Sequence, residues 1–240
     1  MITCFCDSEI KRYDLQYNGE SGESHGVILQ DYPQFSGGAK QYTVTAVAGM
    51  RGELVSDDEG QENLSIDCVF SVISDKFALK LDDLRRWLSG TGTLQFTDGD
   101  DGFYRVWKID YGDIERELRH YGTFSVTFVC EPFKFVVNGQ DEKTIDEVAW
   151  NAYSESRPIY QIAGEGVCTL TVNGNEMIAN VGQNLTIDTE RMLAYRTDGT
   201  PQNTEVTGDY EGLYLIPGEN SVSITSGFAL SIIPNWGYKV

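Results

Sequence analysis

The chain lacks the features that direct a protein to a membrane or to a nucleic acid. No apolar run approaches the roughly 18 residues that a membrane-spanning helix needs. Basic residues are scarce, since 18 Lys and Arg stand against 37 Asp and Glu, a formal net charge of −19 at pH 7. A surface this acidic repels phosphate backbones and anionic lipids. The composition therefore predicts a protein with no nucleic-acid partner and no membrane partner.

The N-terminal segment has neither a basic region nor a long apolar core, so no signal peptide is expected. Cysteine is also sparse. Five cysteines, an odd number, do not make a disulfide framework. Cys68, Cys130 and Cys168 each fall on the apolar face of an expected strand. Cys4 and Cys6 lack the two-residue spacer of a metal knuckle. We expect buried thiols in a chain that folds in a reducing cytoplasm, and no bound metal.

Histidine is limited to His25 and His120, which restricts the chemistry that the chain can perform. Neither lies in a recognisable zinc or hydrolase motif, and there is no Walker loop or dinucleotide fingerprint. The acidic run at 98–102 fails the EF-hand template. No catalytic residue and no cofactor are therefore expected. Paired carboxylates, as in a small glycosidase, stay open as an alternative in a chain with 37 acids.

The chain has strand patterns in quantity. Residues 64–72 and 123–130 alternate apolar and polar side chains, which is the period of a half-buried strand. Pro132 is expected to end the second of these strands, because proline cannot donate to a ladder. In the second half, residues 167–172 alternate and run into Asn173-Gly174, a strong signal for a hairpin.

One segment of the first half has helical periodicity. Ser74 is its expected N-cap and Gly90 its expected stop. Its apolar stripe comprises Phe77, Leu81, Leu84, Leu88 and Trp87. Such a stripe is too wide to leave in water, and we expect it to cover the sheet of its own domain.

Polar residues 138–143 are the expected joint between two domains, 1–137 and 138–240. The second half has short strands with Gly, Asn or Asp between them, and no convincing helix, which is typical of a β-sandwich. The predicted fold class is mainly β with one helix.

Several short motifs, taken in order, resemble the distal tail proteins of long-tailed phages. In the first half they occupy residues 24–29, the turn at 47–52, the helix end at 86–92, the acidic turn at 98–104 and the strand at 128–133. The second half adds Pro158, Gly164, Gly166, and residues 172–174, 187–188, 217–220 and 234–236. The resemblance covers nearly the whole chain.

This resemblance implies a structural protein and not an enzyme. The family's N-terminal domain forms a ring, usually a hexamer, between the tail tube protein and the tail-tip or baseplate proteins. Its C-terminal domain is galectin-like and faces outward, where receptor-binding proteins can attach for host adsorption. The implied location is the tail tip of the virion, after synthesis in the host cytoplasm.

Sugar binding is the other function to consider, because galectin-like sandwiches bind glycans with an exposed aromatic ring and polar neighbours. Candidate residues are Trp150, Tyr195, Arg196 and Trp236. The galectin set of histidine, asparagine and arginine is absent. For Trp236 a core or interface role is the default, because tryptophan buries a large area. The alternative function is thus a carbohydrate-binding module.

Overall fold

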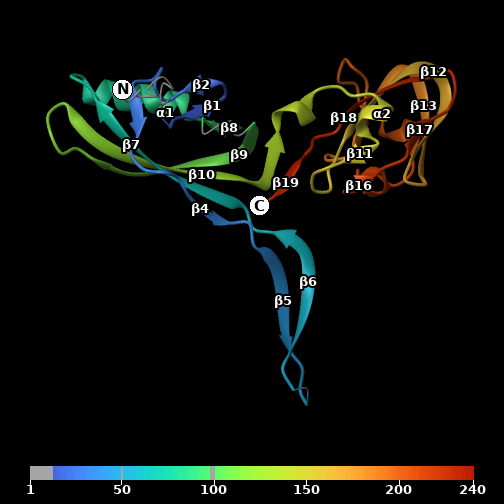
Figure 1. The fold of residues 1–240 in the computed structure, drawn as a ribbon, viewed down its shortest axis with the longest axis horizontal. Helices are drawn as coiled ribbons and strands as arrows, with labels where there is room; N and C mark the ends of the chain where they lie inside the picture. Colours follow the sequence, from blue (N-terminus) through green and yellow to red (C-terminus); the bar gives the residue numbers. More distant parts are fainter. Residues whose placement is uncertain (1–12, 50, 98–100) are drawn as a thin grey trace, which may run out of the picture. The chain divides into compact units, whose positions relative to one another are not determined.

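The computed structural model describes residues 13–49, 51–97 and 101–240. Cys4 and Cys6, Met50 of the expected turn and residues 98–100 of the acidic run lie outside this part. The chain divides into two compact units, residues 1–132 with Val240 and residues 133–239 (Figure 1). Both are built mainly of strands, so the predicted fold class is confirmed.

The first unit is organised around one antiparallel sheet. Its strands are β1 (Leu15–Tyr17), β2 (Glu20–Ser21), β3 (Val27–Leu29), β4 (Gln34–Gly37), β7 (Leu64–Ile73), β8 (Gly92–Phe96), β9 (Gly102–Glu115) and β10 (Tyr121–Val136). They run in the order β2-β1-β8-β9-β10-β7-β3, and β4 also pairs with β7. β7 pairs with β10 over ten residue pairs, and both strands alternate between buried and less buried side chains along this ladder. The predicted alternation is confirmed in both.

Pro132 does not end β10, contrary to the prediction. The ladder with β7 stops at Cys130↔Leu64, so Pro132 lies where no β7 residue needs its missing donor. Its carbonyl accepts the N–H of Val240 at 3.2 Å. β10 then continues to Val136 and pairs at Phe133 to Phe135 with the last strand, β19 (Gly237–Lys239).

Helix α1 (Phe77–Trp87) covers the sheet of the first unit. Phe77, Leu84 and Trp87 are buried in one cluster with the inward side chains of the strands. Leu81 packs against the same cluster from its edge. The prediction that the stripe belongs to the core of its own domain is confirmed.

The expected N-cap of α1 was wrong by two residues. Lys76 holds the cap position without a side-chain hydrogen bond. Ser74 Oγ instead accepts the Lys76 N–H at 3.2 Å, a local turn that competes with helix initiation. The helix ends at Trp87, and Gly90 follows in the left-handed region at φ 78°, as a helix-terminating glycine does.

Two strands of the first unit leave the main sheet. β5 (Lys40–Ala46) and β6 (Glu53–Gln61) pair with each other as an antiparallel ribbon. Within the described residues neither pairs with any other strand. We call this ribbon, residues 40–61, the arm (Figure 1).

The second unit is organised around a hairpin of two 14-residue strands, β12 (Ile159–Val172) and β13 (Asn175–Asp188). Asn173 and Gly174 form its turn with φ of 51° and 85°, so the predicted hairpin is confirmed. The other strands of this sheet are β14 (Leu193–Tyr195), β15 (Val206–Thr207), β17 (Val222–Ile224) and β18 (Ala229–Ile233). A separate pair joins β11 (Trp150–Asn151) to β16 (Gly218–Glu219).

The segment predicted as a joint is tied into the second unit. Residues 137–140 form a 3-10 turn in which Gly139 is buried against Trp236. The Lys143 N–H donates to the Ile232 carbonyl at 2.7 Å. A one-turn helix, α2 (Ile145–Val148), follows and is closed by a capping box. The sequence missed α2 because four residues are too few to show a period. The division at 137/138 into autonomous domains stays a prediction.

The buried cysteines allow a labelling test. Burial raises the pKa of the Cys68 and Cys168 thiols and raises that of Cys130 to about 12. Because the thiolate is the reactive form, all three should resist iodoacetamide at pH 8 in the folded chain. They should react once denaturant exposes them. Mass spectrometry of the labelled peptides measures this, and rapid labelling of Cys68 under native conditions would contradict its burial.

Candidate functional site

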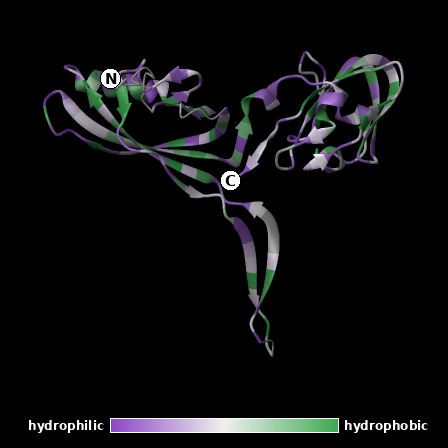
Figure 2. Cartoon of the chain, viewed as in Figure 1, coloured by the Kyte–Doolittle hydropathy of each residue, from purple (hydrophilic) through white to green (hydrophobic). Residues whose placement is uncertain are grey.

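The arm is the most distinctive exposed feature of the first unit. Register pairs Val44 with Val55 and Ala46 with Glu53, and Tyr42 lies on the same face. Tyr42, Val44 and Val55 are each more than half exposed. This face of the arm, which we call its apolar face, thus exposes three large apolar side chains, with Glu53 at its end. Figure 2 shows hydrophobic residues along part of the arm.

The opposite face of the arm is mostly hydroxylic. Thr43 pairs with Ser56 and Thr45 with Leu54, which is the one large apolar side chain on that face. In the connection between the two strands, residues 47–49, 51 and 52 are exposed, and Gly49 and Gly52 adopt φ of 87° and 100°. These glycines belong to the turn at 47–52 that the sequence singled out. The arm is thus an amphipathic ribbon.

A two-stranded ribbon alone is marginally stable in water. Every residue of β5 is exposed, so the ribbon buries little apolar area against its own chain. An exposed apolar face of this kind is typical of a surface that binds another protein. Sequence alone could not identify the arm, because alternation looks the same whether the apolar face meets the chain's own core or a partner.

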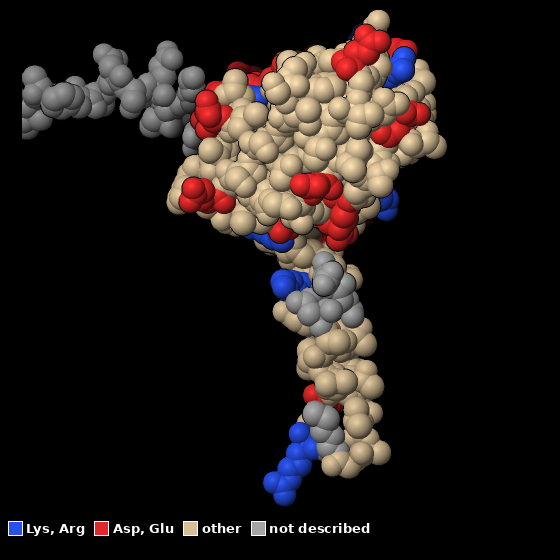
Figure 3. Space-filling model, turned by 90° about the vertical axis from the view of Figure 1, so that its right-hand side faces the viewer, with Lys and Arg blue, Asp and Glu red and all other residues tan. Residues whose placement is uncertain are grey.

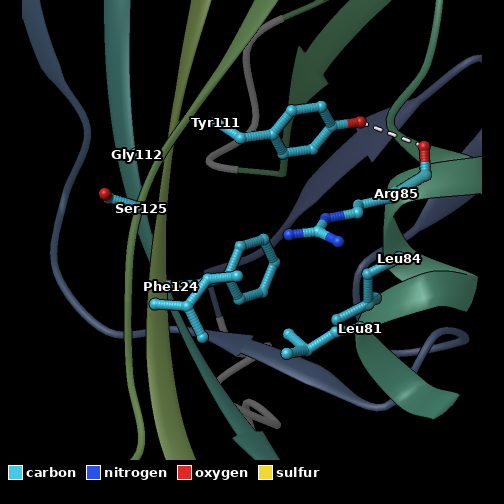
Figure 4. Close-up of a pocket in the computed structure, with 8 residues that line it drawn as sticks. Leu81, Leu84, Arg85, Tyr111, Gly112, Phe124 and Ser125 are labelled. Atoms are coloured by element: carbon cyan, nitrogen blue, oxygen red, sulfur yellow. Dashed lines mark hydrogen bonds between the residues drawn. The ribbon is translucent and has the colours of Figure 1, made fainter. Parts of the chain in front are cut away.

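A cavity between α1 and the sheet is too small to bind a ligand. It measures about 10 Å³, room for roughly one water. Figure 4 shows Leu81, Leu84 and Phe124 directed into it. Tyr111 Oη donates to the Arg85 carbonyl at 3.0 Å and also contacts the Leu88 carbonyl, which fastens β9 to the helix. The cavity is a gap in packing.

The two histidines make structural contacts. His25 Nε2 lies 2.8 Å from Glu20 Oε2, and its ring stacks on Trp87 with centroids 4.2 Å apart. His120 Nδ1 lies 2.9 Å from Asp75 Oδ1, just before α1 begins. The first of these contacts lies at Trp87, the last residue of α1, and the second lies just before the helix begins.

The four sugar-binding candidates come from different elements of the second unit. Trp150 lies on β11 opposite Glu219, whereas Tyr195 lies on β14 opposite Thr186, in a different sheet. Arg196 follows Tyr195 and extends toward Gly182. Trp236 is only 8% exposed and stacks on Tyr153, whereas Trp150 is 66% exposed. Of the two tryptophans, Trp150 alone presents its ring to solvent.

The surface charge of the second unit is strongly negative. Residues 133–239 contain 14 Asp and Glu and six Lys and Arg. Figure 3 shows the carboxylates distributed over the face of this unit that is turned to the viewer. A basic protein surface is the natural electrostatic complement of such a face.

Within the described residues, no three His, Cys, Asp or Glu side chains come together to hold a metal ion. Nor does that part of the chain contain a helix long and apolar enough to cross a membrane.

Comparison with known proteins identifies a fold relative. No family model matches the chain, and no curated protein matches it in sequence. The structure of the Dit (gp 19.1) protein of phage SPP1, described as a paradigm of the hub adsorption apparatus in phages that infect Gram-positive bacteria, is similar with a TM-score of 0.67. The match covers 92% of this chain and 98% of that one at 12% sequence identity. The chain therefore has a Dit-like fold, as the sequence resemblance implied.

Proposed function

We propose that this chain is a structural component of a phage tail. It acts as a distal tail protein whose first unit closes into a ring, a hexamer, between the tail tube protein and the tail-tip or baseplate proteins. The second unit, a galectin-like sandwich, faces outward and offers an acidic surface to basic partners such as receptor-binding proteins. The protein acts by scaffolding, without catalysis, in the tail tip of the virion.

The exposed apolar face of the arm carries this proposal. Tyr42, Val44 and Val55 remain in solvent in the single chain, so a contact with another protein would remove them from water at a gain of roughly 25 cal/mol per Å². A ring needs one patch of each copy to meet a different patch of the next. An arm that extends from the sheet supplies the first of these patches. The Dit-like fold, which spans both units, supports the same assignment.

If the chain forms a ring, its molar mass in solution should increase with protein concentration. Light scattering on the full chain should approach about six times the mass of one copy at high concentration. Val44→Asp combined with Val55→Asp should raise the dissociation constant at least about tenfold, because each carboxylate would be buried without a partner. The melting temperature should not change, since both positions are exposed.

Val167→Asp is the matched control. Val167 lies on β12 of the second unit and is as exposed as the arm valines, so this change should leave the mass unaltered. A wild-type chain that stays monomeric at every concentration would contradict self-assembly. Equal effects of the arm variants and the control would show that added charge, not the arm face, causes the loss.

Glycan binding is the second candidate function, and the exposed ring of Trp150 favours it. Glycan-array binding by the full chain should then disappear in Trp150→Ala while the fold persists. Binding that survives this change would place any sugar site elsewhere.

A further inference from the structure

The sheet of the first unit has an open edge on β9. β8 pairs with β9 only from Gly92↔Val106 to Gln95↔Phe103. β9 continues to Glu115, so residues 107–115 have β10 on one side and, within the described residues, no strand on the other. An unpaired edge of this length presents a row of backbone donors and acceptors to another chain.

This open edge, residues 107–115, carries exposed apolar side chains as well as charged ones. Trp107 is 58% exposed, and Ile114 is also exposed. Soluble proteins usually guard such edges with charged side chains, proline, a bulge or a covering loop. This edge has charged side chains but no proline. Here aromatic and β-branched residues, which favour strand pairing, occupy the edge. Its acidic residues would repel an acidic strand, so the edge favours a partner strand that carries no acid.

The arm and the open edge lie on opposite sides of the same sheet. The arm is inserted in the chain between β4 and β7, whereas the open edge belongs to β9, and β10 separates β7 from β9. One copy can therefore give its arm to the edge of the next, while its own edge receives the arm of the copy before. Repeated in one direction, this head-to-tail contact closes a ring.

Both strands of the arm are short enough to pair with the open edge, and charge selects β5 as the strand that docks. β5 has seven residues, which the nine residues of the open edge can accommodate. The open edge carries Asp110, Asp113 and Glu115 against Lys108. β5 has no acid and one Lys, whereas β6 has four acids, Glu53, Asp57, Asp58 and Glu59. Like charges across a strand pair are destabilising, so β6 is disfavoured.

We infer that β5 of one copy adds as a strand to residues 107–115 of β9 in the next copy. The inference rests on the proposed ring and names the contact that closes it. The ladder supplies main-chain hydrogen bonds, and the alternating side chains of β5 set the register. The apolar face of the arm then packs beside the sheet it extends.

Two sets of charge substitutions, one on β5 and one on β9, test the contact between these strands. Gln41→Glu with Thr45→Glu gives β5 the acidic character of β6 and should weaken assembly about tenfold or more. Adding Asp110→Lys and Asp113→Lys should restore it. These two positions lie on opposite faces of β9, so the pair covers either register. All four residues are exposed, and the fold should tolerate the changes.

Light scattering of the full chain distinguishes the outcomes. Loss with the glutamates and recovery with the added lysines supports the strand addition. If the wild-type chain forms a ring, the glutamates disrupt it and the added lysines do not restore it, the β5–β9 contact is overturned. The proposal of a ring is then unaffected. Rescue by lysines placed on β12, at Glu165 and Val167, would show that only net charge matters and would also overturn it. A wild-type chain that never assembles would overturn both proposals.

Discussion

Replacing Leu84 by alanine should lower the unfolding free energy of the first unit by roughly 2–5 kcal/mol, and Phe77→Ala should do the same. Leu84 is 1% exposed, and Phe77 packs beside Gly122 of β10. Each alanine would leave a cavity where the larger side chain was. Tyr111 holds α1 against β9 through the carbonyls of Arg85 and Leu88, which opposes a shift of the helix into that cavity. Denaturant unfolding followed by circular dichroism measures the loss.

Leu79→Ala is the matched control, because it makes the same chemical change in the same helix at a side chain that is 60% exposed. Its effect should stay within about 0.5 kcal/mol. A melting temperature that falls by less than about 2 °C in both Phe77→Ala and Leu84→Ala would contradict the core assignment. Such a result, together with a loss of assembly, would place the stripe at a contact between copies.

The elements that the sequence predicted well are those with a strong local period. Alternation located β7 and much of β10, the apolar stripe located α1, and Asn173-Gly174 located the hairpin of β12 and β13. In each of these elements local preference and tertiary packing favour the same structure.

The features that the sequence did not predict depend on neighbours far away in the chain. Pro132 is tolerated because the ladder between β10 and β7 ends two residues earlier, at Cys130. No local sequence pattern reveals where that ladder ends. β12 also runs through two glycines, Gly164 and Gly166. Gly164 has no room for a side chain, because a Cβ there would lie 2.3 Å from the Phe228 ring. A close approach of another segment, and not a turn, requires this glycine.

The candidate site depended on tertiary context even more strongly. Tyr42 and Val44 follow the same alternation as core residues, yet they are exposed because β5 never reaches the sheet. Trp150 and Trp236 were both candidates for sugar binding in the sequence, yet one is exposed and the other is buried. Only the fold separates a possible contact residue from a core residue.

Replacing Trp236 by alanine should therefore unfold the second unit more readily, with a loss of roughly 3–5 kcal/mol. The ring stacks on Tyr153 with centroids 5.6 Å apart. The backbone at Trp236 is also fixed, because its carbonyl accepts the Val136 N–H at 2.9 Å and Gly139 packs against it. The side chain thus fills a space whose walls cannot easily close. Thermal and denaturant unfolding of the full chain should both register the loss.

Trp150→Ala makes the same change at the surface and separates a structural role from a binding role. It should leave the unfolding free energy within about 0.5 kcal/mol of wild type, because its ring is mostly in water already. If glycans bind at Trp150, this variant loses binding while it melts normally, whereas Trp236→Ala loses binding only by unfolding. A Trp236→Ala chain that melts within about 2 °C of wild type would contradict the core role, since a cavity of that size cannot form in a packed interior without cost.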